Sequence, residues 1–83
     1  MSLATEICRI TAEQVGEEEA GRVVEVGVEV GDDAGVEPDS LLFWLEILLQ
    51  EPPFKAALPR IHRVGGSTLS VSYLEVRDDD STD

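Results

Sequence analysis

Apolar side chains recur along the first part of the chain at a spacing typical of an amphipathic helix. The residues at this spacing are Leu3, Ile7, Ile10 and Val15, with charged side chains between them. We expect a helix over residues 3–19, with Ser2 as its N-cap and Gly21 as its terminator. Three consecutive glutamates would lie at the negative end of the helix dipole, which favours cations, so this helix is expected to fray after Gly16.

The pattern then changes to a strict alternation over residues 22–30. Its apolar positions are Val24, Val26, Val28 and Val30, and its other positions include Glu25, Gly27 and Glu29. Alternation of this kind predicts a strand with one buried and one wet face, as in a sheet covered by helices on one side. The glycine- and aspartate-rich run 31–35 predicts a loop.

A second helix is predicted over residues 37–49. Pro38 suits the first helical position, and Pro52-Pro53 prevents continuation of the helix. One face carries Leu41, Leu45, Leu48 and Leu49, while Leu42, Phe43, Trp44 and Ile47 cover much of the rest. A helix that is apolar nearly all round cannot leave its far side in water. The second group is therefore expected to form a partner interface, unless it fills the core.

Two further strands are predicted, over residues 58–64 and 69–76. The apolar residues of the second are odd-numbered through Tyr73 and even-numbered afterwards, which indicates a bulge near Tyr73 or burial on both faces. Gly65-Gly66 between the strands predicts a hairpin. A two-residue turn would place Val71 opposite Arg60, whereas a three-residue turn through Ser67 would place it opposite Ile61. The second register matches the faces of the strands better and is favoured.

The predicted order is therefore α-β-α-β-β, an α+β fold. The first two strands are expected to be parallel through a right-handed crossover, and the third antiparallel. The result is a small three-stranded mixed sheet with two helices packed on one face. Residues 1–77 are expected to form a single domain, and residues 78–83 an acidic, disordered tail.

Composition narrows the functional classes. The 83 residues carry 6 Lys and Arg against 18 Asp and Glu, a formal net charge of −12. This charge repels nucleic-acid phosphates and anionic lipid. No apolar run approaches the roughly 20 residues that span a bilayer, and the N-terminus does not read as a signal peptide, so a cytoplasmic setting is expected. The lone Cys8 excludes an internal disulfide and a multi-cysteine zinc site. Such a short chain is therefore expected to gain stability by association, as a homo-oligomer or with a partner.

Candidate catalytic residues are few. His62 could be a general base or metal ligand, but it has no second ligand at metal-binding spacing and is better interpreted as a strand residue. Cys8 is better interpreted as a small apolar residue than as a nucleophile, and Asp32-Asp33 matches no calcium loop. No phosphate loop or hydrolase motif is present. An enzyme is not expected.

Several strings, in this order and spacing, resemble the HypA/HybF family of nickel-insertion proteins for hydrogenase and urease maturation. They are Ser2-Leu3, residues 28–31, the Gly-Val-Glu-Pro helix entry within residues 35–43, and residues 69–76 with their closing Leu-Glu-Val. The resemblance covers Ser2 to Arg77. It implies the same α-β-α-β-β nickel domain.

Two features of that family are missing here. Its zinc ribbon, held by two Cys-x-x-Cys pairs between the second and third strands, is replaced by Gly65-Gly66-Ser67. Its Met-His-Glu start, whose His binds nickel, is missing, because the chain starts Met1-Ser2-Leu3, which matches the family's pattern just after that motif. No metal ligand or cofactor is therefore assigned, and nickel is expected only if the natural N-terminus differs.

Three functional hypotheses follow. The first is a HypA-like scaffold or partner-binding domain in nickel-enzyme maturation, with Leu42, Phe43, Trp44 and Ile47 as its interface. The second is an acidic homo-oligomeric interaction module with no metal role. The third, a small hydrolase or transferase, has little support because no pocket chemistry is evident.

Overall fold

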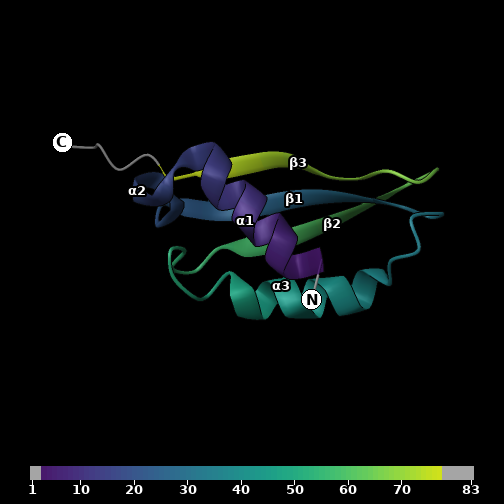
Figure 1. Ribbon diagram of the computed structural model, residues 1–83, viewed down its shortest axis with the longest axis horizontal. Helices are drawn as coiled ribbons and strands as arrows, with labels where there is room; N and C mark the ends of the chain where they lie inside the picture. Colours follow the sequence, from purple (N-terminus) through teal and green to yellow (C-terminus); the bar gives the residue numbers. More distant parts are fainter. Residues whose placement is uncertain (1–2, 78–83) are drawn as a thin grey trace.

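The fold is a three-stranded mixed sheet with helices packed against it, as Figure 1 shows for the computed structural model. The structure describes residues 3–77. Their elements are α1 (Leu3–Val15), α2 (Glu17–Ala20), β1 (Val23–Gly31), α3 (Pro38–Leu48), β2 (Leu58–Val64) and β3 (Leu69–Val76). The predicted α+β class is confirmed, and the last two strands have the predicted bounds.

The order of strands in the sheet is β2-β1-β3, so β1 lies in the middle. β1 is parallel to β2 and antiparallel to β3, which confirms the predicted directions. The predicted hairpin between β2 and β3 is wrong, because these strands form opposite edges of the sheet (Figure 1). Val71 and Ile61 do lie in one row, but each pairs with Val28 between them.

The link from β2 to β3 passes over the end of β1 instead of turning back. The Gly31 N–H donates to the Thr68 carbonyl at 2.6 Å, and the Asp33 N–H donates to the Gly66 carbonyl at 2.7 Å. A Cβ at residue 31 would lie 2.2 Å from the Gly66 oxygen. The link reaches β3 because four residues span up to about 13 Å, more than two strand spacings of about 5 Å each.

Register shifts decide which side chains face the core. Between the pairs Gly27–Tyr73 and Val28–Val71, β3 contains one extra residue, Ser72, so the predicted bulge near Tyr73 is confirmed. A second shift follows Val23 in β1. Because of it Val23 is buried and Val24 only half-buried, which corrects the expected valine face at that position.

The core lies between the sheet and the helices. Its buried apolar residues are Ala4, Ile7, Ala20, Val23, Val26, Val28, Val30, Leu41, Leu45, Leu49, Phe54 and Ala57. α1 crosses in front of the strands, and α3 packs on α1 and on β2 (Figure 1). The buried Thr11 hydroxyl donates to the Ile7 carbonyl at 2.8 Å, so this polar group causes no desolvation penalty.

The first helix ends earlier than expected. α1 stops at Val15, and Gly16 has a φ of 84°, a conformation that glycine adopts without strain. The glutamates that follow do not fray, because they form the first turn of the separate helix α2, where the dipole favours acids. Gly21 ends α2, as predicted for the end of this segment. The predicted N-cap Ser2 and the acidic tail 78–83 lie outside the described residues.

The close crossing of the β2–β3 link over β1 predicts that a methyl group added at residue 31 destabilises the fold. Gly31→Ala should lower the free energy of unfolding by about 1–3 kcal/mol, because the backbone at Gly66 and Thr68 must move away. Gly65→Ala is the matched control, since a Cβ there meets nothing within 4 Å. Urea unfolding measures both variants. Equal stability of the two would contradict the close crossing.

Candidate docking face and neighbouring pockets

The outer face of α3 is apolar and uncovered within residues 3–77. Pro38 opens the helix at its first turn, where the missing N–H costs no hydrogen bond. Leu41, Leu45 and Leu49 are buried on the inner side and fix which way the helix faces. The predicted interface residues, Leu42, Phe43, Trp44 and Ile47, lie on the remaining surface; we call them the α3 outer face.

Three of these four side chains are exposed. Phe43 is 55% exposed, Trp44 50% and Ile47 39%, while Leu42 is half-buried. The Phe43 and Trp44 rings contact each other edge to face, with centroids 5.4 Å apart. Large rings that are half in water are unusual away from binding sites, and aromatic pairs of this geometry hold their shape. The alternative that this group fills the core is excluded for Phe43, Trp44 and Ile47.

A shallow hollow of about 150 Å³ adjoins this face where α1 meets α3. Trp44 and Leu41 line it from α3, Val36 from the preceding loop, and Leu3 from the first turn of α1. Leu3 is 37% exposed. Sequence reasoning placed Leu3 on the inner face of its helix, because the helical period does not show that the helix begins at the rim of the core.

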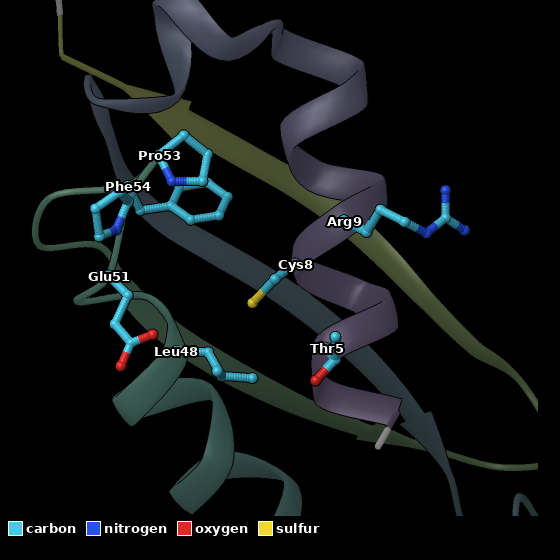
Figure 2. Close-up of a pocket in the computed structure, with 8 residues that line it drawn as sticks. Thr5, Cys8, Arg9, Leu48, Glu51, Pro53 and Phe54 are labelled. Atoms are coloured by element: carbon cyan, nitrogen blue, oxygen red, sulfur yellow. The ribbon is translucent and has the colours of Figure 1, made fainter. Parts of the chain in front are cut away.

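A second pocket, of about 230 Å³, lies between α1 and the turn after α3 (Figure 2). The Cys8 thiol points into this pocket, and the Arg9 guanidinium points away from it. Burial raises the pKa of Cys8 to about 11, so the thiol is protonated at neutral pH. Arg9 instead pairs with Glu6 and Glu13 along the exposed side of α1, which raises the pKa of its guanidinium. This arrangement agrees with Cys8 as a packing residue.

The open face of the sheet carries a polar cluster. The Tyr73 hydroxyl donates to Glu25, and this hydrogen bond, followed by desolvation, raises the pKa of Tyr73. The Tyr73 ring lies over Gly27, where a Cβ would approach its Cε2 to 2.2 Å. The Arg60 Nε lies 3.5 Å from a carboxylate oxygen of Glu25. The ring centroids of the exposed His62 and of Tyr73 are 5.7 Å apart. His62 is thus a surface residue of an edge strand, in agreement with the interpretation preferred from sequence.

The described residues 3–77 contain no cluster of potential metal ligands. Within residues 3–77, no three side chains of His, Cys, Asp or Glu lie close enough together to hold a metal ion. Asp32 and Asp33 are exposed; the Asp32 N–H donates to the carbonyl of Val64 at the end of β2, and the Asp33 N–H donates to the Gly66 carbonyl in the β2–β3 link. None of the helices in this part of the chain is long and apolar enough to cross a membrane.

The chain was compared with known protein families. The model of a family described as hydrogenase/urease nickel incorporation, metallochaperone, hypA matches residues 1–75. Comparison with curated proteins returns no match. The family match covers all six elements of the structure except the last residue of β3.

The environment of Cys8 predicts low thiol reactivity. At pH 8 the folded protein should react with a thiol reagent on the order of a hundredfold more slowly than the urea-unfolded chain, whose thiol has a pKa of about 8.5. Because the folded pKa is raised, the contribution of Cys8 to stability is present below the unfolded pKa and is lost as pH rises towards 11. Cys8→Ser gives the background rate, and equal rates before and after unfolding would contradict the assignment.

Proposed function

The chain belongs to the HypA family of hydrogenase and urease nickel-incorporation metallochaperones, and we propose that it serves nickel-enzyme maturation as a partner-binding scaffold. In this proposal the α3 outer face docks another maturation protein. The observation that supports it is the exposed Phe43–Trp44 pair on a helix whose opposite side is fixed in the core.

The chemistry of the α3 outer face suits a protein partner. Two aromatic rings and Ile47 offer a compact apolar centre, and exposed polar residues such as Glu46 and Ser40 surround it. Interfaces typically gain most of their affinity from a few central aromatic residues with a polar rim. The hollow beside Trp44 would admit one apolar side chain of the partner.

Nickel is proposed to be carried by the partner and not by this chain. The family resemblance assigns the nickel ligand to a His that follows the initial Met, and that His has no counterpart here, because Ser2-Leu3 matches the family residues that come after it. The two Cys-x-x-Cys pairs of the zinc ribbon are likewise missing from the sequence, which contains one cysteine. A scaffold role remains chemically consistent with both absences.

The docking proposal predicts a separation of binding from stability. Phe43→Ala combined with Trp44→Ala should weaken binding to a purified hydrogenase or urease maturation protein by at least about tenfold. The free energy of unfolding should change little, because both rings are about half exposed. Isothermal calorimetry measures the affinity, and Glu18→Ala, an exposed change on α2 away from this face, is the control.

Failure of every maturation protein to bind the wild-type chain would contradict this proposal. It would favour the alternative of an acidic interaction module without a role in metal biology.

The proposed absence of a metal role is tested separately. Titration of the chain with Ni²⁺ should show no stoichiometric site of micromolar or tighter affinity, because no histidine follows Met1. A variant with Met-His-Glu added ahead of Met1 restores the family motif before Ser2-Leu3 and supplies the matched comparison. A tight site in the wild-type chain would overturn the metal-free version of the proposal and leave the docking face to its own test.

A further inference from the structure

The outer edge of β3 is open. β3 is a terminal strand of the sheet, and within residues 3–77 no other strand pairs with the side facing away from β1 (Figure 1). An open edge presents a row of N–H and C=O groups that can pair with another strand. Proteins commonly block such edges with lysine, proline, charges that point inward or β-bulges, and of these β3 has a bulge, at Ser72. β3 has no lysine or proline, and its one charged residue, Glu75, is exposed.

The apolar pattern of β3 reads the same in both directions. From Leu69 to Val76 the sequence is Leu-Ser-Val-Ser-Tyr-Leu-Glu-Val. Its first, third, sixth and eighth residues pair with buried valines of β1 and lie on the helix side of the sheet, where Val76 is still 41% exposed, whereas Tyr73 lies on the open side. The bulge at Ser72 creates this symmetry, because it shifts the alternation by one residue at the strand centre. If two β3 strands pair antiparallel about that centre, each core-side residue meets a core-side residue. The opposed residues are then Leu69 with Val76, Val71 with Leu74, Ser70 with Glu75, and Ser72 with Tyr73.

The backbone N–H and C=O groups at the two ends of β3 point in the directions that this register requires. At one end of β3 the Thr68 carbonyl accepts from Gly31, and at the other end the Arg77 N–H donates to Arg22, so both groups point towards β1. Because backbone groups alternate sides along a strand, those of the adjacent Leu69 and Val76 point away from β1. These two residues are opposite each other in the antiparallel pair, where their free groups would form mutual hydrogen bonds.

A groove beside this edge supplies apolar surface. A pocket of about 390 Å³ lies between α1 and β3. Its apolar lining consists of Leu3, Ile7, Ile10, Leu69 and Val71. Ile10 and Val71 are half-buried, so part of their surface remains in water in the single chain. Two sheets joined edge to edge about a twofold axis would bring the second α1 over this groove and cover that surface.

Charge also permits this pairing locally. Two chains of net charge −12 repel each other at long range, so close contact requires a surface without opposed carboxylates. In this register Glu75 lies opposite Ser70, and no acidic side chain of β3 faces another. Glu6 of α1 also lines the groove, and its carboxylate is paired with Arg9 of the same helix. The other edge strand, β2, carries Arg60 and Arg63. If β2 paired antiparallel with β2 of a second copy about Ile61 or His62, these cations would come close to the same cations of that copy.

From these observations we propose that the protein forms a homodimer through antiparallel pairing of β3 with β3 of a second copy. The two sheets then become one six-stranded sheet with α1 of each copy over the junction. This interface is separate from the α3 outer face, which lies on the β2 side of the molecule, so the two proposals succeed or fail independently.

Charge substitutions at Ser70 test the register. Ser70→Glu would place carboxylates opposite Glu75 at two symmetry-related positions, and should raise the dimer dissociation constant by about tenfold. Ser70→Lys would create two opposite-charge pairs and should lower that constant. Sedimentation equilibrium at several concentrations measures both. Ser40→Glu and Ser40→Lys on exposed α3 make the same changes in net charge away from β3, and should shift the constant much less.

Ser70 also pairs with Glu29 of its own chain, so the stability of each variant must be measured at concentrations where it is monomeric. Dissociation constants that follow net charge equally at Ser70 and Ser40 would overturn the proposal. A wild-type chain that stays monomeric at millimolar concentration would overturn it as well.

Cysteine cross-linking tests the same geometry without charge. In a Cys8→Ser background, Ser70→Cys with Glu75→Cys should oxidise to a covalent dimer, because opposed residues of a non-hydrogen-bonded pair have Cα atoms about 4.5 Å apart. Either cysteine alone should not, because the two copies of one residue lie five positions apart, about 17 Å along the strand. Non-reducing electrophoresis reads the outcome. Equal cross-linking by single and double variants would contradict this register, and binding of a foreign peptide to β3 with no dimer would assign the edge to another partner.

Discussion

The passage of the chain over the end of β1 is the constraint on which the architecture depends. Gly31 has no side chain, and the Gly66 carbonyl occupies the space where a Cβ would project. The link can therefore pass close to the strand end, where its carbonyls accept hydrogen bonds from the N–H groups of Gly31 and Asp33. Because of this crossing, β3 pairs with the edge of β1 opposite to β2, and β1 becomes the central strand. The buried valines of β1, the two free edges and the position of α3 all follow from that order.

Local patterns in the sequence were sufficient to identify every element except α2, which was expected to continue the first helix. The alternation in residues 58–64 and 69–76 predicts both strands with their observed bounds, and the phase change at Tyr73 predicts the bulge at Ser72. The period of apolar residues reports which face of a strand is buried. It does not report which strand lies alongside. Gly65-Gly66 is equally compatible with a hairpin and with a crossing link, and the deciding residue, Gly31, lies more than thirty positions away.

The candidate site was predictable to the same degree and for the same reason. An excess of apolar residues on α3 indicates that one side must remain uncovered, and Phe43, Trp44 and Ile47 are exposed as that argument requires. The hollow beside Trp44 was not predictable, because it depends on where the first turn of α1 meets α3. Membership of the HypA family places the chain in nickel-enzyme maturation.

The central position of β1 also affects biosynthesis. Its neighbours in the sheet are both synthesised later: Glu25 pairs with Leu58, and Val30 with Leu69. During translation the valine-rich β1 segment is therefore synthesised before either strand that pairs with it. Until then both of its edges are unpaired, and unpaired apolar strands promote aggregation. Glu25 and Glu29 within the strand, together with the glutamates just before it, keep that nascent segment strongly anionic. Charged residues placed within and beside an apolar strand in this way disfavour association between nascent chains until β2 and β3 are synthesised.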